Sequence, residues 1–264
     1  MLLDEKMTWD GQGPVFLGKH DPTNGKPDMA YLVDVYQVGC GTSALTTTPS
    51  IETETKRETC TGSRAALSTR IGARELNVGL TAFQFDARTL ATAFYGNASA
   101  VVTGTVTDEP VAAGVGVGDY IFTRYPNVKS VVLTDSAAAP LVLDTHYVIE
   151  DAATGRIRIL ALPAAATVAT IDYSYDPHVH FGIFSTGMVE RGLIFTGINS
   201  AGQRGRLTLP KVNWAMGGDF GWIGDEDAEL QLEGQALFAP QLQFHPQFAP
   251  GFGRVELISA PVGP

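Results

Sequence analysis

Carboxylates crowd one short stretch late in the sequence, and paired carboxylates are a common source of acid–base and metal chemistry. Asp225, Glu226, Asp227 and Glu229 lie close together. A glycosidase needs two such groups facing each other across a cleft, and a Ca²⁺ loop needs a central glycine and a terminal Glu. On a strand, Asp227, Glu229 and Glu233 would instead form a line on one face. This spacing predicts a solvated acidic face, with a hydrolase as an alternative.

Other chemical motifs are weaker. His178 and His180 would point the same way on a strand, but only Asp176 stands nearby to complete a metal site. The glycine-rich run at 39–43 (GCGTS) lacks the lysine and the spacing of a phosphate-binding loop, and no GxSxG elbow occurs. We therefore expect no catalysis, no cofactor and no metal.

The amino-acid composition limits the kinds of partner that the protein is expected to bind. The chain has 264 residues, is 44% hydrophobic and only 17% charged, and carries a formal net charge of −10. Typical soluble domains carry roughly 25% charged residues, so part of this surface is expected to face other protein. Proteins that bind nucleic acid tightly neutralise its phosphates with Lys and Arg side chains. An acidic chain is suited to touching DNA without holding it.

Targeting signals are not evident. The segment MLLDEKMTWDGQG has acidic residues where a signal peptide has basic ones, and no apolar run approaches the ~20 residues of a membrane helix. Cys40 and Cys60 are too few for a disulfide scaffold, although one bridge between them stays open; we expect two half-buried free thiols. A soluble protein made in a reducing cytoplasm is expected, with no membrane partner.

Hydrophobic alternation predicts a mainly β fold. One face of a long strand at 69–85 carries Leu76, Val78, Leu80 and Ala82. The single expected helix covers about 86–95, with Asp86 as its N-cap, Phe85 and Leu90 spaced as a hydrophobic staple, and Gly96 as its stop. Residues 39–50 are expected to form a small-residue loop. Further strands are expected at 31–38, 181–186, 188–198, 206–214 and 226–237.

The domain boundaries are predicted from changes in strand length and local composition along the chain. Short strands separated by Ala-rich links predict an inserted β-sandwich-like domain at 105–176, flanked by linkers. The main β domain then comprises 31–104 and 177–240. Gly, Pro and Asp at 1–30 predict an extended N-terminal arm, and the prolines at 241–264 predict a C-terminal arm. The tail carries aromatic side chains that are candidate contacts between subunits: Phe238, Phe244, Phe248 and Phe252.

The strand predicted at 51–60 has no apolar face. One side carries mainly Thr with Ile51 and Arg57, and the other carries Glu52, Glu54, Lys56 and Glu58. A strand that is polar on both faces is weakly specified alone, whereas assembly would fix its register. If several copies close a continuous β-barrel, one face can line a water-filled lumen and the other, with Arg57, can meet a neighbour.

Three stretches carry a family resemblance: SIETETKRETCTGSR (50–64), RELNVGLTAFQFDARTLATAFYG (74–96) and PKVNWAMGGDFGWIGDEDAELQLEGQAL (210–237). In pattern and order, most of 30–104 and 177–240 resembles the major tail tube proteins of long-tailed (siphovirus-like) bacteriophages. The resemblance implies a tail-tube-like β-sandwich or barrel that forms stacked, commonly hexameric rings in the virion tail, after assembly in the host cytoplasm. It also implies contacts with itself, with a tape-measure protein and with tail-tip or terminator proteins, and no catalysis.

The resemblance implies an acidic lumen through which DNA passes during ejection. By position its candidate lining residues are Glu52, Glu54, Glu58, Asp227, Glu229 and Glu233. A negative wall would keep phosphates hydrated and mobile, whereas a positive wall would trap DNA. With the opposite facing, Thr53, Thr55 and Thr59 would line the lumen instead. Alternatives are a tail terminator, a head-decoration protein, or a carbohydrate-binding or adhesive β module whose active part is the insertion.

Overall fold

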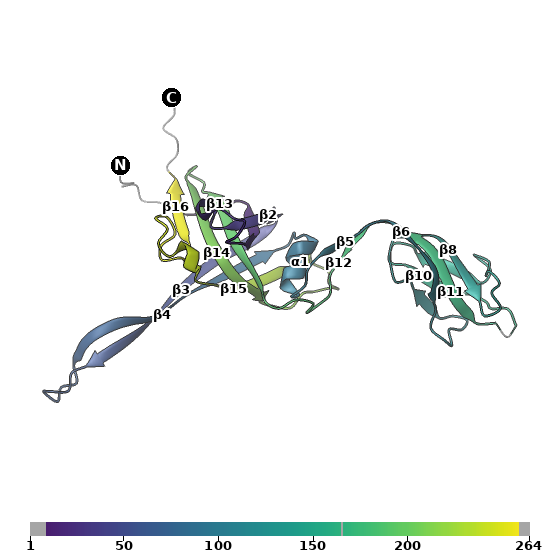
Figure 1. Ribbon diagram of the computed structural model, residues 1–264, viewed down its shortest axis with the longest axis horizontal. Coiled ribbons are helices and arrows are strands. Elements are labelled where there is room, and N and C mark those ends of the chain that lie inside the picture. The colour runs from purple at the N-terminus through teal and green to yellow at the C-terminus, as the bar shows by residue number, and fades with distance from the viewer. Residues whose placement is uncertain (1–8, 165, 259–264) are drawn as a thin grey trace, which may run out of the picture. The chain divides into compact units, whose positions relative to one another are not determined.

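The computed structural model describes residues 9–164 and 166–258, which form two compact units (Figure 1). Unit 1 contains Met1–Asn97 and Phe181–Pro264, and unit 2 is the inserted segment Ala98–His180. The mainly β fold predicted from the sequence is confirmed. Unit 2 is wider by a few residues at each end than the insertion expected at 105–176.

The elements of unit 1 are mostly strands: β1 (Val15–His20), β2 (Leu32–Gly39), β3 (Thr42–Arg57), β4 (Ala66–Ala82), β13 (Val189–Ile198), β14 (Arg204–Met216), β15 (Leu230–Ala236) and β16 (Arg254–Ile258), with helix α1 (Ala87–Ala93) and the 3-10 turns η1 (Pro27–Met29) and η2 (Pro240–Leu242). Unit 2 contains β5 (Ser99–Val101), β6 (Gly104–Pro110), β7 (Tyr120–Phe122), β8 (Val128–Asp135), β9 (Tyr147–Asp151), β10 (Arg156–Ile159), β11 (Val168–Tyr175) and β12 (His178–His180).

Unit 1 is built on one eight-stranded antiparallel sheet. Its order is β2-β1-β13-β14-β15-β4-β3, with β16 paired to β14 beside this path. Alternate residues of these strands form the main core, in which Trp214 is fully buried and donates Nε1–H to the Arg191 carbonyl at 3.0 Å. Val78, Leu80 and Ala82 of β4 lie in this core, as their alternation predicted.

Helix α1 packs on the core side of β14 and β15. The Asp86 carboxylate accepts hydrogen bonds from the Thr89 amide at 2.8 Å and the Thr89 hydroxyl at 2.7 Å, which confirms the predicted N-cap. Phe85 and Leu90 both pack against the main core. Gly96 does not supply the left-handed stop, because the helix ends through Tyr95, whose φ is 54°.

The N-terminal segment is not an extended arm over its described part. Residues 15–20 form β1, which lies between β2 and β13 in the sheet and pairs with both. Val15 and Leu17 are buried in the main core. The Gly, Pro and Asp residues that suggested an arm form the turns around this strand, while its short VFL run supplies enough apolar surface to join the sheet. Residues 1–8 lie outside the described part.

The C-terminal segment is not an arm either, as far as residue 258. It folds back so that Leu242 and Phe248 are fully buried in a second core with Ala30, Leu32 and Ala239. Arg254 covers the Phe248 ring, with its Cζ atom 4.5 Å from the ring centroid. The chain then enters β16, an edge strand that begins beyond the prolines, as expected for a residue type that cannot donate to a β-ladder.

Several predicted element boundaries in and around the main domain are wrong. Residues 42–50, expected in a loop, begin strand β3, because their Thr-rich sequence pairs with the apolar alternation of β4. No strand covers 181–186; the chain there turns beside α1, with the Phe184 amide bonded to the Phe94 carbonyl at 3.0 Å. The late strand starts at Leu230 and not at 226.

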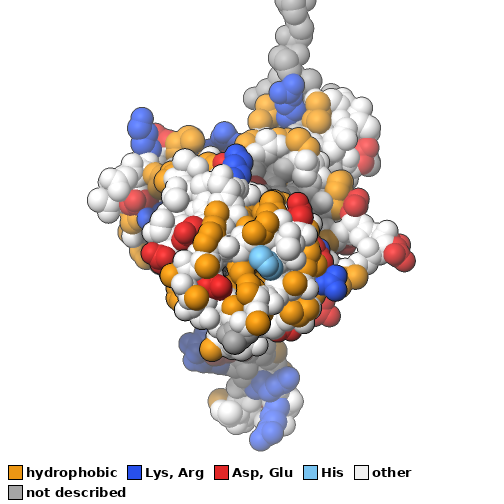
Figure 2. All heavy atoms as spheres, turned by 90° about the vertical axis from the view of Figure 1, so that its right-hand side faces the viewer, with side chains coloured by type: hydrophobic (Ala, Val, Ile, Leu, Met, Phe, Trp, Pro, Cys, Tyr) orange, Lys and Arg blue, Asp and Glu red, His pale blue; other side chains and the backbone are white. Residues whose placement is uncertain are grey.

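Unit 2 is a small β-sandwich. One sheet has the order β7-β10-β9 and the other β6-β11-β8, and both contribute side chains to one core. Burial raises the pKa of Tyr173 to about 12, and its hydroxyl donates to Glu109 at 2.5 Å. Figure 2 faces unit 2 and shows hydrophobic side chains spread between acidic ones on its surface.

Cys40 and Cys60 are free and exposed, so the expected half-burial is wrong and no bridge joins them. Within residues 9–164 and 166–258, no helix is long and apolar enough to cross a membrane.

Candidate functional site

A long β-hairpin projects from the sheet of unit 1 (Figure 1). Strands β3 and β4 pair from Thr42↔Ala82 to Arg57↔Ala66. Near the sheet, Leu45 and Leu76 still pack against the main core. Beyond them, residues 49–75, which we call the outer arm, are exposed except for the half-buried Glu58. The outer arm is therefore a two-stranded ribbon with water on both faces.

Strand pairing gives the outer arm two chemically different faces. Thr55 and Thr69 face each other, with their hydroxyl oxygens 3.4 Å apart. By register, the same face carries Ile51, Thr53, Leu67 and Ile71, with Arg74 opposite Ile51, and we call it the threonine face. Ile51, Leu67 and Ile71 are 57%, 72% and 50% exposed. Three aliphatic side chains thus lie in water on a face that continues the core face of β3 and β4.

The opposite face of the outer arm is charged. Glu52, Glu54 and Lys56 alternate along β3, and Arg70 on β4 donates its Nε–H to Glu54 at 2.6 Å. The whole outer arm has five basic and four acidic residues, although the chain as a whole is strongly acidic. Glu54 is therefore a partner in an exposed ion pair.

Glu58 lies in the tip of the arm, beyond the end of β3, and not on a strand face. Its carboxylate accepts hydrogen bonds from the Ser63 hydroxyl at 2.6 Å, the Thr61 hydroxyl at 2.5 Å, and the amides of Thr61 and Cys60 at 3.0 and 3.1 Å. These bonds lower the pKa of Glu58 to about 2, with the Ser63 hydroxyl contributing most. The role of Glu58 here is to hold the turn, which alternation alone did not predict.

A polar face runs along the root of the hairpin, on the side of the sheet away from the core. Glu233 of β15 lies opposite Gly79 of β4, which lies opposite Thr46 of β3. Glu233, Gln231 and Gln235 are exposed and alternate with the buried Leu230 and Leu232. By register this polar face continues into the charged face of the outer arm: Thr48, Ser50, Asn77 and Glu75. Glu52, Glu54 and Glu233 thus share one side of the sheet.

Asp227 and Glu229 do not lie on a strand. They belong to an exposed loop at 217–229 whose five acidic residues line a hollow of about 460 Å³: Asp219, Asp225, Glu226, Asp227 and Glu229. The loop is anchored by Phe220, whose ring packs edge-on against Phe85 at 5.5 Å. Its Trp222 and Ile223 are 70% and 99% exposed. The predicted strand at 226–237 therefore began too early, because residues 226–229 belong to this glycine-containing loop.

The four tail phenylalanines have different positions. Phe248 is fully buried in its own chain, so its assignment as an inter-subunit contact is wrong. Phe252 is partly buried beside Phe238, with ring centroids 5.9 Å apart, and Phe238 is 41% exposed. Phe244 is 88% exposed. Arg57 donates to the Arg64 carbonyl at 3.2 Å, within the tip of the arm.

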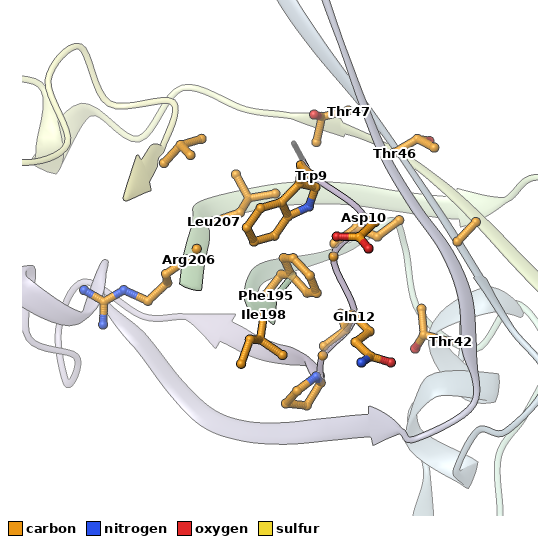
Figure 3. Close-up of a pocket in the computed structure, with 18 of the residues that line it drawn as sticks. Trp9, Asp10, Gln12, Thr42, Thr46, Thr47, Phe195, Ile198, Arg206 and Leu207 are labelled. Atoms are coloured by element: carbon orange, nitrogen blue, oxygen red, sulfur yellow. The ribbon is translucent and has the colours of Figure 1, made fainter. Parts of the chain in front are cut away.

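A groove of about 1280 Å³ opens on unit 1 beside the root of the hairpin (Figure 3). Trp9, Phe195 and Leu207 form its apolar side, and Thr42, Thr46 and Thr47 of β3 border it. The Trp9 indole lies over Gly205, where a Cβ atom would come within 2.8 Å of the ring. Asp10 and Ser43 also line the groove, but the Asp10 carboxylate accepts from the Ser200 amide at 3.0 Å and the Ser43 hydroxyl donates to the Thr81 carbonyl at 3.3 Å. The described residues also contain no group of three His, Cys, Asp or Glu side chains that could hold a metal ion.

The hairpin, the polar sheet face and the sandwich insertion define a β protein with a projecting arm and no grouped catalytic residues in the described part of the chain. The sequence matches the family described as "Protein of unknown function UCP028589" over residues 8–256, and the chain belongs to that family. No curated protein matches it.

Proposed function

We propose that the protein is a structural subunit that polymerises through its outer arm into stacked rings, as the tail tube of a long-tailed bacteriophage does. The observation that carries the proposal is the exposure of residues 49–75 on both faces. A two-stranded hairpin alone is marginally stable in water, and a third strand or a packed face is needed to hold it. A neighbouring copy would supply that packing.

The two faces of the arm suit two environments. The threonine face has Ile51, Leu67 and Ile71 available for burial against a neighbour. Burying apolar surface contributes about 25 cal/mol per Å², so three aliphatic side chains, repeated around a ring, are a substantial driving force. The polar face, with Glu233 and uncharged Gln, Asn and Thr side chains, needs no partner and suits a water-filled lumen.

DNA passage fits this polar face better than DNA binding. Glu233 is an acid among neutral polar side chains at the root of the hairpin. DNA binders gain affinity by releasing counterions through Lys and Arg contacts with phosphates, and such contacts are scarce on this face. The proposed partners are other copies, a tape-measure protein, tail-tip and terminator proteins, and DNA in transit.

The test compares the intact protein with a variant in which residues 51–74 are replaced by a two-residue Asn-Gly turn, which joins the paired residues Ser50 and Glu75. Light scattering after size exclusion, over a range of concentrations, should show rings or longer polymers for the intact protein and monomers for the variant. Circular dichroism and thermal unfolding should show that the variant keeps its fold, because the removed residues lie outside the cores. Equal polymerisation of the two proteins would contradict the proposal.

A further inference from the structure

We propose that unit 2 carries a saccharide-binding platform on the outer face of the β7-β10-β9 sheet. Tyr120 and Phe122 are 49% and 64% exposed, while Ile121 between them is buried. Because alternate residues of a strand share a face, the two rings stand side by side about 6.6–6.8 Å apart along β7. Adjacent exposed aromatic rings offer electron-rich faces to the C–H groups of pyranose rings.

Polar groups are arranged next to these rings. By register, Arg156 lies opposite Phe122 and Arg158 lies opposite Tyr120. Both arginines pair with Glu150 on β9, through Nε at 3.4 Å and Nη1 at 3.7 Å. The Arg158 guanidinium also lies near the Tyr120 ring, 5.9 Å from its centroid. Each guanidinium has five N–H donors, so donors remain for hydroxyl or carboxylate oxygens of a ligand while Glu150 fixes their positions.

The size of the platform favours a saccharide over a protein partner. Three strands about 4.8 Å apart, each with three to five residues rising about 3.3 Å, make a face on the order of 200 Å². A specific protein interface buries about 800 Å² on each partner. An oligosaccharide of two or three rings matches the smaller area. The pair of aromatic rings on β7 matches its apolar faces, and the neighbouring pair of guanidinium groups on β10 matches its hydroxyl edges.

Binding is tested on the full-length protein with two probes, the neutral cellohexaose and the acidic hexagalacturonate, by isothermal titration calorimetry. We expect saturable binding of at least one probe. Tyr120→Ala and Phe122→Ala should each weaken it at least about tenfold, which is a loss of about 1.4 kcal/mol. Val132→Ala, at another exposed position of unit 2, should leave it unchanged. Arg158→Ala should weaken hexagalacturonate binding more than cellohexaose binding, because the carboxylates lose their charged donor.

Failure to bind either probe would overturn the platform, as would binding that survives the Tyr120→Ala and Phe122→Ala changes together. If that double variant instead loses self-association in size exclusion while the intact protein binds no saccharide, the face is a protein contact and the inference is wrong. Failure to bind a saccharide does not by itself bear on the proposed tube, which depends on the arm of unit 1.

Discussion

Thr55 and Thr69 face each other across the outer arm with their hydroxyl oxygens 3.4 Å apart, on the same side of the ribbon as the exposed Ile51, Leu67 and Ile71. The β3 sequence alone presents two polar faces, whereas pairing with β4 adds two of these three aliphatic side chains to the threonine side. The arm therefore has one face suited to burial and one suited to water, and each face predicts a different mutant phenotype.

Ile71→Asp should block polymerisation without unfolding the monomer. Ile71 is half exposed in the single chain, so the change should alter the free energy of unfolding by no more than about 0.5 kcal/mol. In the polymer it would bury an unpaired carboxylate, which is costly. Light scattering and thermal unfolding measure the two effects. The control is Ser68→Asp on the charged face, which should polymerise normally; equal loss in both variants would disprove the assignment of faces.

Phe248→Ala should destabilise unit 1 by about 3–5 kcal/mol, because the ring is fully buried with Leu242 and Leu32 and its removal leaves a cavity. Phe244→Ala, at a ring that is 88% exposed, should change stability by no more than about 0.5 kcal/mol. Chemical denaturation of both variants makes the comparison. Similar stabilities for the two variants would show that the tail does not fold back on its own chain.

Glu58 should titrate with a pKa near 2 in the intact protein, measured from its side-chain carbon shift by NMR. Because this pKa is lowered on folding, its contribution to the stability of the tip is complete above the unfolded value, about 4.3, and is lost as the pH falls through about 2. Ser63→Ala removes the largest cause and should raise the pKa of Glu58 toward its ordinary value. An unchanged pKa in that variant would contradict the hydrogen-bonded turn.

Glu233→Lys should make assembled particles retain DNA. The side chain is exposed on the polar face, so assembly should survive the change. A ring of lysines would release counterions from DNA, and the retention should fall steeply between 50 and 200 mM salt, as is usual for phosphate contacts. Co-sedimentation with short duplex DNA measures it. The comparison variant is Glu229→Lys, in the loop at 217–229. If that variant retains DNA more strongly than Glu233→Lys does, the loop and not the polar face lines the lumen.

The elements that the sequence predicted well are those whose pattern is local. Asp86 caps α1, Val78 and Leu80 alternate into the core, and the short strands of the insertion form a sandwich. The failures depend on distant pairing. Residues 42–50 become strand only because β4 lies beside them, and Phe248 is buried only because Leu32 and Ala30 come from the other end of the chain. Among the candidate lumen residues, Glu52, Glu54 and Glu233 share a side of the sheet, whereas Glu58 and Asp227 lie in turns and loops that alternation cannot describe.

Electron cryomicroscopy of the purified full-length protein at high concentration tests the central proposal most directly. The account predicts rings or hollow tubes in which the threonine face of each outer arm is buried against a neighbouring copy, with Ile51, Leu67 and Ile71 in the contact and Glu233 facing the bore. A strictly monomeric species, or an assembly whose outer arms project freely into solvent, would contradict it.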